Sequence, residues 1–426
     1  MSSTKEIQEK KLNARLYPIY KMVSWDLLFY YSIIYLFLTQ AKTFSASQVL
    51  LGEAVFTVSC LVLQIPIGLL IDKIGKRSSL VLANICMCVF TFVLMITTSY
   101  SQLLIAYFID AIGYVIKGIC ETNILYDALP KGKKRGKLYS MLDGLGASRY
   151  YVIDAITSLV AGFAYVINPY FPIILCFIGN VIATILSTRF RKIESKEKEK
   201  SVGTREYFKQ LKSAGKFAIK SKRMMCLLIF FGLVSGLLYN MTTLRSGVLA
   251  QINLPEQYFG IVFAILQIAA SICSRAQNII QKRYKNNTLA YLGIPLTVSC
   301  IIIGLLSKGN QSLFKVFIII TLFVIQGAIK GVYNVLIYRY LNNFTTKNIR
   351  TKLATIRSLV YNVFTIIISL FGSLLLSVTD ASNTILLIGC MSTIAIILLL
   401  DYMRDKVGLK PNKYPEEDLK YYKVKQ

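Results

Sequence analysis

The sequence of 426 residues has no histidine, a single tryptophan and only 16% charged residues. Without histidine, the common imidazole ligand of metal sites and the base of a Ser-His-Asp triad are both missing. All nine cysteines lie inside apolar runs and none forms a C-x-x-C pair, which favours packing over a metal, redox or disulfide role. No G-x-x-x-x-G-K-[ST] phosphate loop is present either. We therefore expect no catalytic residues, no metal and no cofactor, and the chain is not predicted to be an enzyme.

Acidic residues are also scarce, with 21 Asp and Glu against 49 Lys and Arg, which gives a formal net charge of +28. Such an excess by itself would suit a nucleic-acid partner. The chain is however 55% hydrophobic, with a mean hydropathy of +0.55, whereas a soluble domain carries about 25% charged residues. This is more apolar surface than a soluble core can hide, so the chain is predicted to be an integral membrane protein.

Apolar runs long enough to cross the bilayer recur along the chain, since a helix needs roughly 20 such residues to span it. The runs lie near 19–40, 47–72, 78–98, 102–127, 138–166 and 170–189, and then 224–249, 257–280, 288–306, 313–338, 352–377 and 383–402. The pattern predicts an all-α protein with twelve transmembrane helices in two six-helix bundles. The first run lacks a small-residue cleavage site, so we interpret it as a retained helix. The expected domains are 1–190, a cytoplasmic linker 191–223, 224–402 and a cytoplasmic tail 403–426.

Basic residues set the orientation of these helices. With both termini in the cytoplasm, most Lys and Arg residues fall in the N-terminal segment up to Lys21, the inner loops, the linker and the tail. The outer loops then hold only Lys42, Lys308 and Lys315. This is the positive-inside distribution, and it assigns the excess charge to an anionic lipid surface instead of a nucleic acid. We expect a multi-pass protein of a bacterial plasma membrane.

The two halves of the chain share short sequences in the same order. Ile116-Lys117-Gly118 in the fourth predicted span recurs as Ile329-Lys330-Gly331 in the tenth. Leu63-Gln64-Ile65 in the second recurs as Leu266-Gln267-Ile268 in the eighth. Repeats of this kind are typical of transporters whose solute site lies near the membrane midplane, between the two repeats.

One loop carries a recognisable signature. The segment from Gly68 to Arg77, GLLIDKIGKR, follows the second span. It resembles the G-x-x-x-D-x-x-G-[RK]-[RK] loop of the major facilitator superfamily at every defined position. The resemblance implies a cytoplasmic gate, to which we assign Gly68, Asp72, Gly75, Lys76, Arg77 and Asp127. We expect Asp72, Arg77 and Asp127 to approach one another within ion-pair range.

The end of the fourth span, Gly118 to Asp127, looks like the S-G-x-x-E-A-L-L-Y-D segment of bacterial drug-efflux-like members of this superfamily. The resemblance implies a monomeric secondary transporter, with export of a small organic solute as the first hypothesis. An uptake symporter is the second. A membrane-embedded binding or immunity protein that does not transport its ligand remains the alternative from a different class.

Ionisable residues inside the predicted spans are candidate site residues, because charge in hydrocarbon is costly and normally faces a cavity. In this superfamily the first, fourth, seventh and tenth spans line the cavity. We therefore assign the solute and proton site to Asp26, Asp110, Lys117, Glu121, Gln326, Lys330 and Asn334. An intrahelical Lys117–Glu121 bridge is the simpler explanation of that pair.

The signs of these charges constrain the solute. Acids prevail in the spans of the first half, whereas the bases Arg245, Arg275, Lys330 and Arg357 prevail in the spans of the second half. We expect a zwitterionic or acidic solute to be transported better than a lipophilic cation. Glu121 is the foremost candidate to carry protons.

Overall fold

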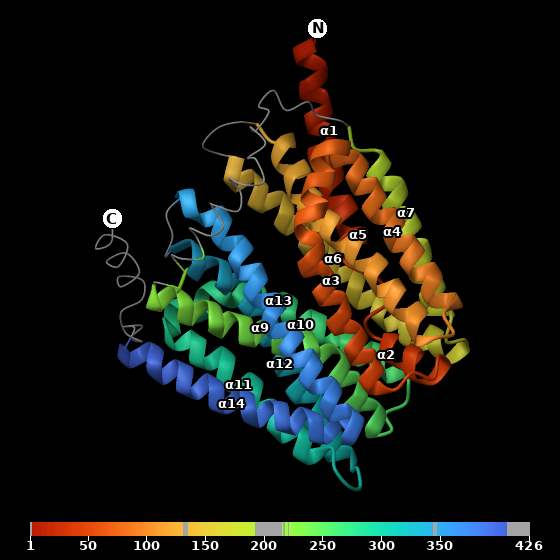
Figure 1. Ribbon diagram of the computed structural model, residues 1–426, viewed down its shortest axis with the longest axis vertical. Helices are drawn as coiled ribbons and strands as arrows, with labels where there is room; N and C mark the ends of the chain where they lie inside the picture. The colour runs from red at the N-terminus through yellow and green to blue at the C-terminus, as the bar shows by residue number, and fades with distance from the viewer. Residues whose placement is uncertain are drawn as a thin grey trace. The chain divides into compact units, whose positions relative to one another are not determined.

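The computed structural model describes residues 2–130, 135–191, 221–343 and 347–406, together with 215, 218 and 219, and in this part every element is helical (Figure 1). The prediction of an all-α membrane fold is confirmed. The helices are α1 (Ser2–Ser24), α2 (Ile34–Leu36), the π-helix η1 (Phe37–Ala41), α3 (Ala46–Ile74), α4 (Lys76–Ile96), α5 (Tyr100–Ala128), α6 (Arg135–Ile167), α7 (Phe171–Thr188), α9 (Lys222–Gln251), α10 (Gln257–Tyr284), α11 (Asn287–Leu306), α12 (Leu313–Asn343), α13 (Lys347–Val378) and α14 (Ala381–Lys406).

Eleven of these helices, α3 to α14, are long and apolar enough to cross a membrane. The first predicted span, 19–40, differs from the expectation of a continuous helix. Its helix α1 begins far earlier, at Ser2, and ends at Ser24 inside the apolar run. Residues Trp25 to Ile33 are not helical, and the short α2 and η1 complete the segment. Hydropathy depends on composition alone, so it identifies the apolar run but cannot show where the helix is interrupted.

The chain divides into two compact units, the first made of residues 1–198 and 254–267 and the second of 199–253 and 268–426. The predicted N-terminal bundle, 1–190, corresponds to most of unit 1. The start of α10 also packs with unit 1, so the division runs through this helix. The predicted linker 191–223 and tail 403–426 lie largely outside the described residues.

In unit 1, α5 is the central helix and packs against α3, α4 and α1, while α6 covers α1 and α7 covers α4. Its core is built by Tyr20, Ile71, Leu80, Ile116 and Leu125 with their neighbours. Helices α3 and α5 begin with the same capping box, in which Ser45 pairs with Gln48 and Ser99 with Gln102.

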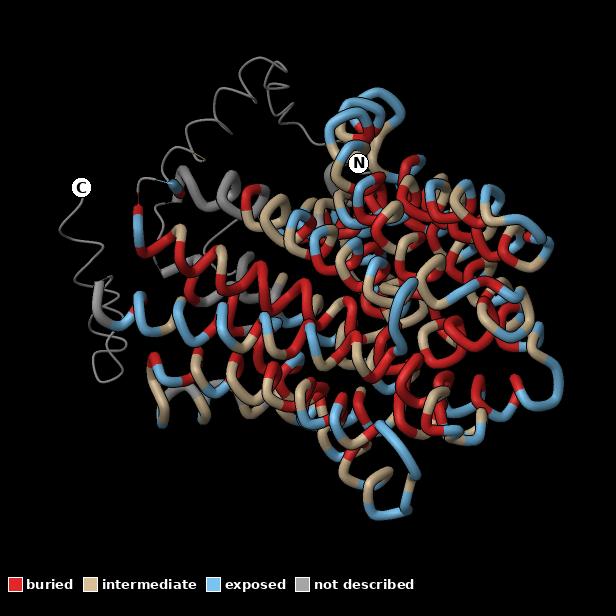
Figure 2. Tube along the Cα trace, turned by 60° about the horizontal axis from the view of Figure 1, so that its bottom comes forward, coloured by how far each residue is buried: buried red, intermediate tan, exposed pale blue. Residues whose placement is uncertain are grey.

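In unit 2, α9 is the most buried helix, and it packs against α13, α14 and α12. The pair α11 and α14 crosses closely, because Gly304 and Gly389 leave no side chain between the two backbones. The tube in Figure 2 shows buried residues alternating with intermediate and exposed ones along many of the helices.

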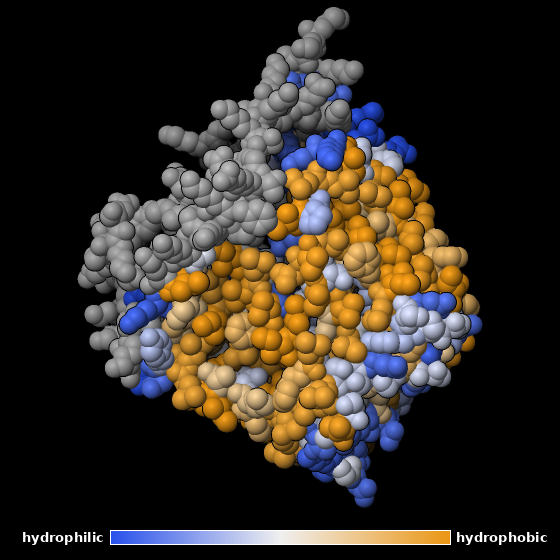
Figure 3. All heavy atoms as spheres, viewed as in Figure 1, coloured by the Kyte–Doolittle hydropathy of each residue, from blue (hydrophilic) through white to orange (hydrophobic). Residues whose placement is uncertain are grey.

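Exposed side chains on the helix faces are largely apolar, among them Val62, Ile105, Phe163, Ile272 and Leu398. Figure 3 shows apolar residues over the middle of the helices and hydrophilic residues gathered toward their ends. A water-soluble protein rarely exposes such large apolar patches, whereas a helix surrounded by lipid must.

Candidate functional site

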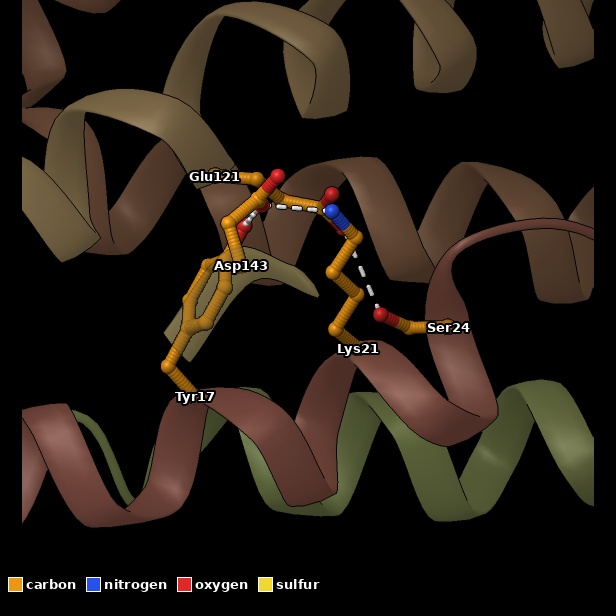
Figure 4. A network of polar contacts seen from close by, with 5 residues as sticks. All are labelled: Tyr17, Lys21, Ser24, Glu121 and Asp143. Atoms are coloured by element: carbon orange, nitrogen blue, oxygen red, sulfur yellow. Dashed lines mark hydrogen bonds and ion pairs between the residues drawn. The ribbon is translucent and has the colours of Figure 1, made fainter. Parts of the chain in front are cut away.

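Three helices of unit 1 bring a polar network together, with Tyr17, Lys21 and Ser24 on α1, Glu121 on α5 and Asp143 on α6 (Figure 4). Lys21 Nζ lies 2.5 Å from Asp143 Oδ1. The Tyr17 hydroxyl donates to the same oxygen at 2.9 Å. The Ser24 hydroxyl lies 3.3 Å from Glu121 Oε1. Spacings of four and three residues place the α1 members on one face of that helix.

Sequence analysis assigned only Glu121 of this network to the site and missed Tyr17, Lys21, Ser24 and Asp143. Lys21 was grouped with the bases of the N-terminal cytoplasmic segment. It is only 5% exposed. Its ammonium lies 4.7 Å from the centre of the Trp25 ring, within cation–π range. A Cβ at Gly146 would lie 3.0 Å from the Lys21 side chain, so a glycine on α6 makes room for it. The helical spacing of Tyr17, Lys21 and Ser24 beside an apolar run could have indicated that Lys21 lies on a buried polar face.

Glu121 is buried and its carboxylate accepts from Ser24. The expected intrahelical bridge to Lys117 is not formed, because no ion pair joins the two side chains within the described part of the chain. Lys117 and Lys21 are the charged groups that interact with Glu121 electrostatically. Glu121 therefore connects the network on α1 to the charges further along α5.

Lys117 and Asp110 lie on α5 with side chains that are 6% and 8% exposed. Among the described residues, neither makes a hydrogen bond or an ion pair. Both act on their surroundings only through longer-range electrostatics, in which Asp110 interacts with Asp26 and with Lys117. Lys117 and Asp110 are therefore a buried ammonium and a buried carboxylate on one helix without a direct partner among the described residues.

Asp26 lies in the break of the first span and is half-buried. Its Oδ1 accepts from the backbone amide of Leu27 at 2.9 Å and from the Tyr31 hydroxyl at 2.7 Å. The Asp26 carboxylate thus accepts from a backbone amide that has no helical carbonyl partner, because α1 has ended.

The predicted gate lies where α3 ends and α4 begins, with only Gly75 between the two helices. The ion pair found there differs from the expected one. Lys76 Nζ lies 2.8 Å from Asp127 Oδ2. Arg77 instead donates to the backbone carbonyl of Thr188 at 2.8 Å. Consecutive helical residues point about 100° apart, and α4 packs on both α5 and α7, so Lys76 faces Asp127 while Arg77 faces the end of α7.

The two glycines and the aspartate of the signature segment Gly68 to Arg77 differ in their conformation and surroundings. Gly75 has a φ of +86°, a conformation that a side chain would strain, which explains glycine between two adjoining helices. A Cβ at Gly68 would meet nothing within 4 Å. Asp72 is exposed, and in the described part of the chain no ion pair joins it to Arg77 or Asp127.

On α12 of unit 2, the three expected site residues have different surroundings. Gln326 is fully buried and donates to Ser299 Oγ of α11 at 2.9 Å. Lys330 and Asn334 are exposed. The contacts of Gln326 therefore explain it as a residue that joins α11 to α12, and Lys330 and Asn334 stay the candidates on this helix.

Sequence comparison matches the family model of the Major Facilitator Superfamily to residues 22–320 and 296–425. No curated protein matches the sequence.

The fold is similar to solved transporter structures at low sequence identity. A crystal structure of the nucleoside transporter NupG has a TM-score of 0.70 and 12% identity, covering 94% of this chain and 99% of that one. A POT family transporter in complex with 5-aminolevulinic acid has a TM-score of 0.68 and 13% identity, with coverages of 95% and 96%. A D-xylose-proton symporter has a TM-score of 0.64 and 12% identity, with coverages of 92% and 96%. With a family match over nearly the whole chain, and with a fold that agrees, the chain belongs to the Major Facilitator Superfamily.

Proposed function

We propose that the chain is a secondary active transporter that moves a small charged organic solute by alternating access, coupled to protons. The observation that supports it most is the pair Asp110 and Lys117, both more than nine-tenths buried and without an ion pair among the described residues. A Lys or Asp at the centre of a transmembrane helix costs about 2.5–3.5 kcal/mol on insertion scales. Charges retained at such a cost are characteristic of a solute pathway.

The spacing of this pair supports a solute with two charged groups. Seven residues correspond to a rise of about 10 Å, and to almost two full turns, so both side chains lie on one face of α5. Helical side chains lean toward the N-terminus, so the Lys117 chain extends toward Asp110. A zwitterion with its acidic group on Lys117 and its amino group toward Asp110 fits this order.

Unit 2 offers a second base at the corresponding place of its repeat. Lys330 and Asn334 are exposed on α12, and Lys330 belongs to the triplet that repeats Ile116-Lys117-Gly118. We propose that Lys330 also binds an acidic group of the solute. The transporter structure bound to 5-aminolevulinic acid, a molecule with an amino and an acid group, supports this class of solute.

Glu121 is the proposed proton carrier, since it is buried and interacts with Lys117 and Lys21. When Glu121 takes up a proton, those two ammonium groups lose an anionic neighbour, and their attraction for an acidic solute rises. The proposed direction, export, follows from the resemblance at the end of α5. A similar structure is a proton symporter, so uptake is the second candidate.

The test is transport in proteoliposomes with an internal pH dye, using a panel of amino acids, dipeptides, nucleosides and ethidium. The wild type is expected to move protons with a zwitterionic or acidic solute and to move ethidium poorly. Glu121→Gln is expected to abolish the pH dependence, and Lys330→Ala to lower the affinity for the solute. Efficient ethidium transport that neither variant alters would refute the proposal. Binding of the solute without any flux would favour the non-transporting alternative.

A further inference from the structure

We expect the break in the first predicted span to leave backbone polar groups at membrane depth. In the described part of the chain, the amides of residues 26–32 donate to no backbone carbonyl. The helical pattern resumes only where the amides of Ile33 and Ile34 both donate to the Tyr30 carbonyl, at 3.1 and 2.9 Å. Non-helical backbone at this depth is tolerated where it is buried in protein or lines a cavity, because lipid cannot satisfy it.

The geometry of the break is held in place by the residues around it. Phe29 has a φ of +63°, a left-handed conformation that is rare outside glycine. Leu28, Tyr30 and Ser32 are buried, and Asp26 accepts from Leu27 and Tyr31 on one oxygen. The other carboxylate oxygen of Asp26 remains for a further partner.

Two features at this break favour a positive charge. The last carbonyls of α1 have no intrahelical partner, and they form the negative end of the dipole of a helix of 23 residues. Asp26 and Asp110 interact with each other electrostatically, and Lys117 is the base that interacts with Asp110. Lys21 in the last turn of α1 is paired with Asp143. Asp26 and Asp110, with Lys117 as the remaining base, therefore leave a negative excess at the end of α1.

Asp110 supplies an independent indication of a ligand. It is 8% exposed and comes from a different helix, α5, and among the described residues it makes no hydrogen bond or ion pair. Its other electrostatic neighbours include Tyr30 and Tyr31, which belong to the break. A buried carboxylate that has a second carboxylate as an electrostatic neighbour is stabilised by a positive partner.

We propose that the break in the first span is a binding site for a small monovalent cation, held by Asp26, Asp110 and the carbonyls at the end of α1. Discontinuous transmembrane helices coordinate cations in this way in other transporter folds. The cation is an alkali ion or the ammonium group of the solute, and both present the same chemistry to these oxygens. The ammonium arm rests on the proposed function, whereas an alkali-ion site requires binding alone and does not depend on transport.

Trp25, the only tryptophan of the chain, lies in the break, so its fluorescence can report cation binding there. The experiment is a fluorescence titration of the purified full-length protein in detergent with sodium, potassium and methylammonium chloride. Choline chloride keeps the ionic strength constant. A saturable change with sodium or potassium identifies an alkali-ion site, and a change with methylammonium alone identifies an ammonium subsite.

Variants separate the site from general salt effects. Asp110→Asn and Asp26→Asn are expected to raise the dissociation constant at least tenfold, and Asp110→Glu, which keeps a carboxylate, to retain saturable binding. Asp401→Asn removes an exposed acid of α14 and is expected to leave the curve unchanged. The proposal is overturned if none of the three cations changes the emission of the wild type. It is also overturned if Asp110→Asn and Asp26→Asn titrate like the wild type. Emission that follows pH alone would overturn it too, because the two acids would then share a proton.

Discussion

Replacing Lys21 by Met tests whether the network between α1 and α6 stabilises unit 1. Met keeps the length of the side chain and removes its charge. The ammonium that lies 2.5 Å from Asp143 is lost, together with its contact to the Trp25 ring. Asp143 keeps only the hydrogen bond from Tyr17.

The size of the effect follows from the burial of the two partners. Removing one partner of a fully buried ion pair costs about 3–5 kcal/mol, because the other charge is left uncompensated. Here the Lys21 side chain is 7% exposed but that of Asp143 is 32% exposed, so water screens part of the interaction. We expect Lys21→Met to lower the free energy of unfolding by about 1–3 kcal/mol. Lys21→Met and Asp143→Asn combined should cost less than the sum of the single changes.

The measurement is unfolding of the purified protein in mixed micelles, followed by circular dichroism. The control is Lys10→Met, which removes a more exposed ion pair to Glu6 on the same helix, with nitrogen and oxygen 2.6 Å apart. Exposed pairs contribute about 0–1 kcal/mol. If Lys21→Met is no more destabilising than Lys10→Met, or if the two changes at Lys21 and Asp143 are additive, the network does not hold α1 to α6.

Two further predictions concern helix packing and the gate. Gly331→Ala should prevent proper folding, because the new Cβ would overlap the Ala270 carbonyl; the measurement is the yield of monodisperse protein. Gly118→Ala, at the corresponding place in the first half, should be tolerated, because a Cβ there would meet nothing within 4 Å. Lys76→Ala should impair transport while membrane insertion stays intact, because the ion pair to Asp127 is lost; transport at the wild-type rate would show that this pair does not act in the gate.

The fold was predictable because a helix that crosses lipid must consist mostly of apolar residues. Apolar runs of about 20 residues located α3 to α14, and a short signature located the turn at Gly75. The break after Ser24 was not predictable from hydropathy, since residues 27–38, LLFYYSIIYLFL, continue the apolar run. It depends on a carboxylate, Asp26, that captures a local amide and a tyrosine hydroxyl.

The sequence identified the ionisable residues inside the apolar runs, but not the contacts that they make. Charges within apolar runs pointed to Asp110, Lys117 and Glu121, yet the i,i+4 rule favoured a bridge that the structure lacks. Lys21 was missed because its burial depends on Gly146, which is distant in the sequence. Local spacing cannot report such tertiary contacts.

The most direct test of the central claim is solute-driven proton movement in proteoliposomes containing Lys117→Gln, with the solute that the wild type transports best. Lys308→Gln, an exposed lysine of an outer loop, is the matched control. A hydrogen bond to a charged group contributes about 1.5–3 kcal/mol, which corresponds to roughly a ten- to hundredfold change in affinity. The account predicts a loss of that size for Lys117→Gln and none for Lys308→Gln. Wild-type affinity and rate in Lys117→Gln would contradict it.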